Sequence, residues 1–242
     1  MNTTPATLTS ASIQREVTIT PENIEDFRSA PGPFPDCTQL IWCVPGPRLD
    51  RSVLAKFPNI RILECQNCNL TTLEELADLC LKIQQLYCFK NCLRSLLGIG
   101  HLKYLELLQC SDNFIENLEE LLNCLLLNAL YCSGNRIDNF ESLRLCSLLT
   151  FIAAHNNKLG SLVDLQHLPL MKNLGVSGNC IRSLKGVEFL KNLESFCCQN
   201  NSLTSVKELL SLPNLKSVMC SINNSDLSIA EQQLLERTRP RN

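Results

Sequence analysis

Apolar residues recur along most of the chain at intervals of 22 or 23 residues. Each unit follows the template L-x-x-L-x-L-x-x-N-x-L, and the fourth template position is apolar in all nine units. The first template position falls at Cys37, Ile60, Ile83, Leu105, Leu127, Leu149, Met171, Leu193 and Leu215. A fixed period of this length predicts a repeat protein, in which each unit buries its apolar face against its neighbours.

The stretch around the third to the seventh template position alternates apolar and other residues, which predicts a strand with one buried face. About nine such strands, stacked in parallel about 4.8 Å apart, would give a sheet roughly 40 Å long. The second half of each unit carries apolar residues spaced three apart, as in Leu73, Leu76 and Leu79, which favours 3₁₀ or short helical segments. We therefore expect an α/β fold: a right-handed solenoid with a parallel concave sheet and a helical convex side.

Asparagine occupies the ninth template position in seven consecutive units. These residues are Asn91, Asn113, Asn135, Asn157, Asn179, Asn201 and Asn223. The turn after each strand leaves buried backbone groups without partners in the sheet, and an asparagine side chain offers both donors and an acceptor to satisfy them. The pattern predicts a ladder of stacked asparagines along one edge of the solenoid.

Both ends of a repeat array need a cap, because the terminal units would otherwise expose their apolar faces. We divide the chain into an N-terminal tail and capping segment over 1–36, about nine repeats over 37–225, and a C-terminal capping helix and tail over 226–242. Residues 20–29 predict a short helix with Thr20 as its N-cap and Pro21 in its first turn.

At the C-terminal end, Ser228 and Glu231 have the spacing of a capping box, which predicts a helix that begins there and runs to about Glu236. We expect the apolar residues of this helix to cover the last repeat. They are Ile229, Leu234 and Leu235.

The period and the asparagine column together resemble the leucine-rich-repeat family, in particular its class with 22-residue units, over about residues 37–225. That class includes a regulatory subunit of protein phosphatase 1, an axonemal dynein light chain, a spliceosomal subunit and bacterial invasion proteins. The resemblance implies that the concave sheet binds another protein. In the phosphatase regulator, aromatic and acidic concave residues contact the phosphatase; Tyr87, Phe89 and Phe151 match the aromatic kind, and Glu64 alone matches the acidic kind.

Template positions three, five and seven are expected to project from the concave sheet, and Glu64 is the one charged residue among these 27. Large side chains cluster in the central units, at Tyr87, Phe89, Tyr131, Phe151 and His155. Aromatic side chains with a polar group, set among small polar residues, are what partner-binding surfaces favour. We predict that these five residues, together with Glu64, form the binding surface. The alternative is that they are ordinary surface residues and that the convex face or an edge binds.

Composition and charge argue against nucleic-acid binding and against membrane association. The chain has 22 Lys and Arg against 24 Asp and Glu, a net charge of -2, and no concave Lys or Arg, so we expect no nucleic-acid partner. The sequence contains neither an apolar run of the roughly 18 residues that span a bilayer nor a signal-peptide core, so we expect no membrane association and a location in the cytoplasm or the nucleus. The 15 cysteines are then expected to be reduced thiols.

Six cysteines share the sixth template position, which faces inward: Cys65, Cys88, Cys110, Cys132, Cys198 and Cys220. We interpret them as small apolar core residues, and we expect no metal or cofactor. The alternative is a metal- or redox-responsive protein, for which Cys65, Cys68, Cys88 and Cys92 are the set that would have to converge. Cys197 falls at an outward position, so we expect it to be the most accessible thiol.

Catalytic chemistry finds little support in the sequence. His155 is the one concave histidine; no carboxylate shares its column, and the nearest concave thiol, Cys197, lies two units or about 10 Å away. We therefore expect a monomeric, non-enzymatic scaffold or regulatory subunit. Its partner would be another protein, such as a phosphatase catalytic subunit or a cytoskeletal or axonemal component.

Overall fold

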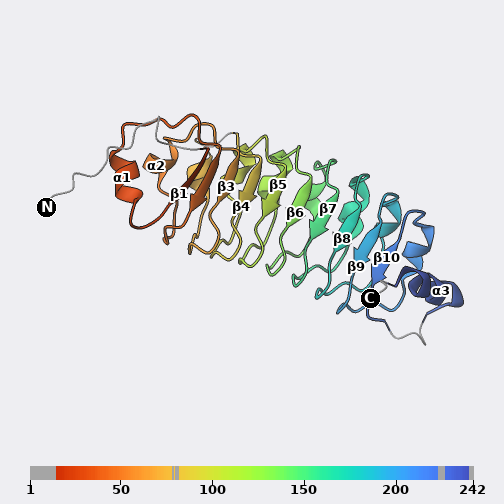
Figure 1. Cartoon of the computed structure of the whole chain (residues 1–242). Coiled ribbons are helices and arrows are strands. Elements are labelled where there is room, and N and C mark those ends of the chain that lie inside the picture. The colour runs from red at the N-terminus through yellow and green to blue at the C-terminus, as the bar shows by residue number, and fades with distance from the viewer. Residues whose placement is uncertain (1–14, 78, 80–81, 223–226, 240–242) are drawn as a thin grey trace.

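The computed structural model describes residues 15–77, 79, 82–222 and 227–239, and these form one solenoid. Ten short strands pair in chain order into a single parallel sheet, with the first and the last strand at opposite ends of the array (Figure 1). The strands are β1 (Glu16–Ile19), β2 (Gln39–Trp42), β3 (Ile62–Glu64), β4 (Gln85–Tyr87), β5 (Leu107–Gln109), β6 (Ala129–Tyr131), β7 (Phe151–Ala153), β8 (Asn173–Gly175), β9 (Ser195–Cys197) and β10 (Ser217–Met219).

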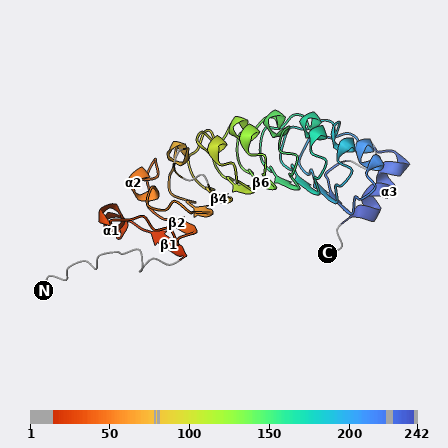
Figure 2. The same cartoon turned by 90° about the horizontal axis from the view of Figure 1, so that it is seen from above.

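The solenoid curves into an arc with the strands on the inner side and helical turns on the outer side (Figure 2). Seven 3₁₀ helices follow the strands: η2 (Glu74–Leu76), η3 (Ile99–His101), η4 (Glu119–Asn123), η5 (Glu141–Leu143), η6 (Val163–His167), η7 (Val187–Phe189) and η8 (Lys207–Ser211). Between the two layers, apolar template residues form one continuous buried core. The predicted fold class is confirmed.

The first strand, β1, precedes the predicted repeats. Val17 and Ile19 are buried, and the strand pairs in register with β2, as Glu16 does with Gln39. The expected count of about nine strands was therefore one too low. Residues 16–19 keep the apolar fourth and sixth template positions, but the ninth position is Glu22 and not asparagine, so this unit lacks the residue that marks most of the others.

The N-terminal cap contains two short helices, α1 (Ile24–Ser29) and α2 (Arg51–Leu54). The prediction that Thr20 caps the first helix was wrong. The side chain of Asn23 accepts a hydrogen bond from the Thr20 amide at 2.8 Å, and the Thr20 carbonyl accepts from the Ile24 amide at 3.0 Å. These bonds close a turn over residues 20–23, and the helix begins only after it.

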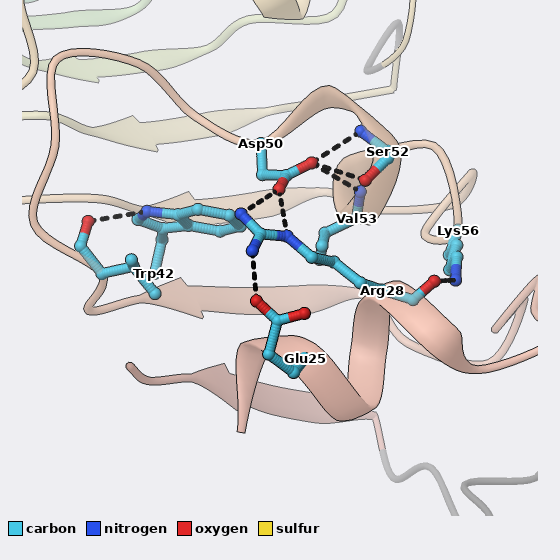
Figure 3. Close-up of polar contacts among 8 residues, drawn as sticks. Glu25, Arg28, Trp42, Asp50, Ser52, Val53 and Lys56 are labelled. Atoms are coloured by element: carbon cyan, nitrogen blue, oxygen red, sulfur yellow. Dashed lines mark hydrogen bonds and ion pairs between the residues drawn. The ribbon is translucent and has the colours of Figure 1, made fainter. Parts of the chain in front are cut away.

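Charged side chains tie the two cap helices together (Figure 3). Asp50 is the N-cap of α2, accepting from the Ser52 amide at 2.9 Å, and it also pairs with Arg28 of α1 at 2.7 Å. The Lys56 ammonium donates to the carbonyls of Phe27, Arg28 and Ala30, the last of which follows α1. Lys56 therefore satisfies carbonyls at the C-terminal end of α1, where a cation is favourable.

The C-terminal cap is helix α3 (Ile229–Thr238), and the predicted capping box between Ser228 and Glu231 is present. Leu234 is buried and Leu235 packs against the core. The prediction for Ile229 was wrong: its side chain is 75% exposed, because it lies on the outer side of the first turn, while Leu227 just before the helix is buried. Residues 1–14 and 240–242 of the two predicted tails lie outside the described residues.

Six of the predicted ladder asparagines lie just beyond the carboxyl ends of the strands and bridge neighbouring units, while Asn223 lies outside the described residues. Asn135 is representative. Its amide nitrogen donates to the carbonyls of Cys110 and Cys132, each at 3.0 Å, and its oxygen accepts from the Ile115 amide at 2.9 Å. Each side chain therefore satisfies backbone groups of two units.

Two further features complete this edge. Cys68 stands at the asparagine position of its unit, and its thiol donates to the Trp42 carbonyl of the preceding unit at 3.1 Å, as an asparagine nitrogen does elsewhere. The residue before each ladder position has a positive φ in seven units, at Asn67, Lys90, Asp112, Gly134, Asn156, Gly178 and Asn200. Glycine and asparagine tolerate this conformation best, which accounts for their frequency there.

Candidate partner-binding surface

The strands line the inner face of the arc (Figure 2), and the side chains at their first and third residues, half-buried in most strands, project from this face. Tyr131 of β6 and Phe151 of β7 stack there with ring centroids 4.7 Å apart and an interplanar angle of 33°. Ala129 is the register partner of Phe151, and Ala153 is the register partner of Tyr131. These two small residues leave room for the rings to lean diagonally across the strands, so the sequence places an aromatic pair at the centre of the sheet.

A second group lies towards the N-terminal end, on β3 and β4. Glu64 and Tyr87 are register partners, and Phe89 follows on the same side. Gln39 donates to the Glu64 carboxylate at 2.8 Å, which fixes its orientation, and Gln66 donates to it at 3.4 Å. Sequence reasoning did not assign a role to these two glutamines. Strand β5 separates this group from the Tyr131–Phe151 pair, so the six predicted residues form two clusters.

Beside the aromatic pair, the inner face is hollowed over β7, β8 and β9. The hollow has a volume of about 160 Å³. Its lining residues are Phe151, Ile152, Ala153, His155, Asn173, Leu174, Gly175, Ser195 and Cys197. The small outward residues of β8 and β9 create it, because they leave the sheet surface low next to the Phe151 ring.

The imidazole of His155 lies directly over Gly175. A Cβ atom at Gly175 would lie 2.4 Å from His155 Nε2 and 2.5 Å from Cε1, so glycine is needed for this edge of the ring to approach β8 so closely. The Ser177 amide donates to His155 Nδ1 at 3.2 Å, which fixes the other side of the ring. Burial lowers the pKa of His155, and the ring is therefore neutral at pH 7. It presents Nε2 to the hollow as an uncharged polar group.

Cys197 also lines this hollow, and its thiol lies 3.0 Å from the Ser177 hydroxyl. The prediction that Cys197 is the most accessible thiol was wrong. It is half-buried, whereas Cys43 and Cys180 are exposed. Position five does face outward, but the neighbouring strands of a concave sheet crowd the thiol from both sides, while Cys180 lies in an open turn beside the ladder.

The inward cysteines are embedded in the core. Burial raises the pKa of Cys88 and of Cys132 to about 12, so both thiols are protonated and unreactive at pH 7. Cys65 and Cys68 are buried as well, and Cys92 is half-buried. Across the described residues, no group of three or more His, Cys, Asp or Glu side chains has the arrangement that would hold a metal ion.

Comparisons with known proteins bear on the fold. No family model matches the chain, and no curated protein matches it. Internalin F of Listeria monocytogenes superimposes with a TM-score of 0.75 at 18% identity, covering 90% of this chain and 62% of the internalin. Internalin C2 of the same species gives 0.71 at 23% identity, with 81% and 83% covered. The plant peptide hormone receptor RGFR1, in complex with RGF2, gives 0.65 at 19% identity, with 85% and 35% covered.

At these identities the likeness shows the fold. The chain is a leucine-rich-repeat solenoid, with ten parallel strands alternating with 3₁₀ turns. It spans 62% of the length of internalin F. Solenoids of this kind present an extended concave surface that commonly binds proteins and peptides. Within the described parts of the chain, no helix combines the length and apolar character needed to cross a membrane.

Proposed function

We propose that this protein is a non-enzymatic scaffold or regulatory subunit that binds a segment of another protein on its concave face. The observation that carries the proposal is the stacked Tyr131–Phe151 pair at the rim of an uncharged hollow. Two stacked rings form a rigid apolar anchor with one phenolic hydroxyl, and the hollow beside them accepts a side chain or a turn of a partner. Binding surfaces concentrate their energy in such anchors.

The chemistry of the surface favours recognition by shape. Two acidic residues stand in the outward columns: Glu16 lies at the N-terminal end on β1, and Glu64 is already hydrogen bonded to Gln39. The His155 ring beside the hollow is neutral. The partner is therefore a segment with an exposed apolar or aromatic side chain and neutral polar neighbours, and its affinity depends little on salt. A phosphatase catalytic subunit and a cytoskeletal or axonemal component are the two partner classes that the repeat type suggests, and both fit a monomer in the cytoplasm or nucleus.

The test compares affinity purification with the wild-type chain and with the double variant Tyr87→Ala, Phe151→Ala. Both side chains are half-buried on the sheet surface and lie outside the core, so the variant should fold, as circular dichroism would verify. We expect it to lose the partners that the wild type retains. Phe189→Ala is the matched control, since Phe189 is 54% exposed on the convex helix η7. Equal recovery of partners by the folded double variant would refute concave-face binding.

A further inference from the structure

A second surface lies at the edge of the sheet where the strands begin, which we call the entry edge. The turn into each strand places one residue directly before the first template position. In three units this residue is an asparagine: Asn59, Asn192 and Asn214. Their side chains donate to the carbonyls of the preceding turn, at 2.9 Å to Pro35, 2.8 Å to Pro169 and 2.9 Å to Lys191.

In the four central units the same position is apolar. Tyr104 is 53% exposed, Leu126 41%, Leu148 40% and Leu170 42%, and the adjacent Leu125 is 53% exposed. We call these five residues the entry-edge stripe. Four of them, Tyr104, Leu126, Leu148 and Leu170, occupy equivalent places in consecutive units and form a continuous row, about 14 Å long at the spacing of parallel strands, which Leu125 widens.

Folding does not explain this stripe. Asn59, Asn192 and Asn214 show that the turn accepts a polar residue, which even adds a hydrogen bond between units. A leucine that remains two-fifths exposed leaves much apolar surface in water, and a row of such residues is a feature of surfaces that are covered by a partner. The apolar residues are also confined to the centre of the array, with polar residues at this position on both sides.

The geometry of the stripe fits a helix. An α-helix laid along it presents one apolar side chain per 5.4 Å turn, close to the spacing of about 4.8 Å between units, so three or four contacts stay in step. Leu126, Leu148 and Leu170 are also more than half buried by their neighbours, so they lie level with the surface. They suit a grooved contact with side chains better than insertion into a lipid layer, which requires projecting residues.

The charged residues around the stripe indicate which charges a partner helix would carry. Exposed lysines flank the stripe, with Lys82 and Lys103 towards the N-terminal end and Lys191 towards the C-terminal end. Their ammonium groups donate to neutral oxygens, of Asn59, Gly100 and Ser211 respectively, so their positive charge is not compensated by a carboxylate through these bonds. The acidic residues nearest to these lysines are Glu106, Glu120, which accepts from the Gly100 amide, and Glu194, which pairs with Lys216. The ends of the stripe are thus basic, although the whole chain carries a net charge of -2.

We propose that the entry-edge stripe binds an amphipathic helix of a partner protein whose apolar face is flanked by acidic residues at both ends. This site is separate from the concave face, so a scaffold of this kind holds two partner segments at once. The stripe lies along the turns and the concave clusters lie on the strands, which allows the two sites to be disrupted independently.

The test uses two designed helical peptides that share a leucine face and differ only at their flanks, one with glutamates and one with lysines. Binding of each labelled peptide to the full chain is measured by fluorescence anisotropy. We expect the glutamate peptide to bind at least about tenfold more tightly than the lysine peptide, and to weaken with added salt. Equal binding of the two peptides, or no binding of the glutamate peptide, would overturn the proposal.

The decisive variant is Leu126→Asn with Leu148→Asn, which introduces the residue that flanking units use at the same position and therefore preserves the fold. We expect at least about a tenfold loss of affinity for the glutamate peptide. Phe189→Asn on the convex side, and the concave variant Tyr87→Ala, Phe151→Ala, should bind like the wild type. Loss of binding in the concave variant with no loss in the stripe variant would assign the peptide to the concave face and contradict the proposal.

Two further measurements test whether the stripe is instead covered by a lipid surface or by a second copy of the chain. If the wild type, but not the stripe variant, sediments with phosphatidylserine vesicles, the stripe is a lipid-binding surface and the helix proposal fails. If light scattering shows a dimer that the stripe variant loses, the occupant is a second copy of the chain and the proposal fails in the same way. We expect the wild type to remain monomeric and unbound to vesicles.

Discussion

Asparagine recurs at both edges of this solenoid, with opposite consequences. At the edge where the strands end, it fills the ladder in seven consecutive units of the sequence. At the edge where the strands begin, it appears in three units and gives way to leucine or tyrosine in the four central ones. Both kinds of asparagine donate hydrogen bonds to a neighbouring unit, as Asn135 does to Cys110 and Asn192 does to Pro169.

The difference lies in burial. The ladder residue Asn135 is 8% exposed, and the groups it satisfies have no access to water. Asn192 is exposed, and the carbonyl it reaches belongs to a surface turn. A buried backbone group that loses its partner costs far more than an exposed one, which simply bonds water. Folding therefore fixes the ladder edge, while the entry edge is free to carry other residues and with them a function.

The largest expected effect is at the ladder. Asn135→Leu removes four hydrogen bonds and leaves the buried Ile115 amide without its partner, while the Cys110 and Cys132 carbonyls keep only the bonds from Asn113 and Asn157. At about 1–3 kcal/mol for the unsatisfied amide and about 0.5–1.5 kcal/mol for each of the other lost bonds, we expect the free energy of unfolding to fall by about 3–5 kcal/mol. Urea denaturation followed by circular dichroism measures it. A loss below about 1 kcal/mol would mean that water replaces the amide and that the ladder is not what fixes this edge.

The C-terminal cap extends the comparison, because Glu231 there does what asparagine does in the ladder. Its carboxylate accepts hydrogen bonds from the Val206 amide at 2.7 Å, the Ser205 hydroxyl at 2.6 Å and the Ser228 amide at 2.9 Å. Burial raises the pKa of Glu231, but these hydrogen bonds lower it more, from 4.5 to about 2. A glutamine side chain has only one oxygen that can accept hydrogen bonds, whereas both carboxylate oxygens of Glu231 do so. We therefore expect Glu231→Gln to lower the free energy of unfolding by about 2 kcal/mol at pH 7.

The pH dependence gives this variant its control. Because the pKa is lower in the folded state, the carboxylate contributes its full stability above pH 4.5, and the contribution is lost as the pH falls from 4.5 towards 2. The difference in unfolding free energy between wild type and Glu231→Gln should therefore shrink as the pH falls from about 5 to about 3. A difference that stays constant over that range would show that the charge of Glu231 is not responsible.

The sequence predicted the repeated part of the fold well, because each strand is specified by a template that nine units share. It failed where a residue stands outside that template. Thr20 was predicted to be the N-cap of the first helix, a position that Asn23 occupies. Strand β1 was not predicted, and Ile229, which was expected to cover the last repeat, faces solvent. These outcomes depend on how the terminal segments pack on the array, and no neighbouring unit repeats the information.

For the candidate site, the register alone places Tyr131 and Phe151 on one face of the sheet. It does not predict that the rings stack, since stacking depends on the space left by Ala129 and Ala153. The position of His155 over a glycine, and the crowding that shields Cys197, likewise arise from side-chain volumes on adjacent strands. The sequence shows the entry-edge stripe only as apolar residues at one recurrent position. The exposure of these residues in the structure is what distinguishes them from the core.

The smallest expected effect is at the entry edge, where the comparison is tested by exchanging residues between its units. Asn192→Leu removes one exposed hydrogen bond, to the Pro169 carbonyl, and Leu148→Asn introduces the equivalent residue in a central unit. We expect Asn192→Leu to change the free energy of unfolding by less than about 0.5 kcal/mol, because water replaces the lost bond. We expect Leu148→Asn to lower it by about 1 kcal/mol, because the leucine is only partly buried. Thermal and urea denaturation, with Asn135→Leu as the reference, make the measurement. A loss of about 2 kcal/mol or more in Leu148→Asn would show that the stripe is part of the core packing, and its leucines would then need no partner to explain them.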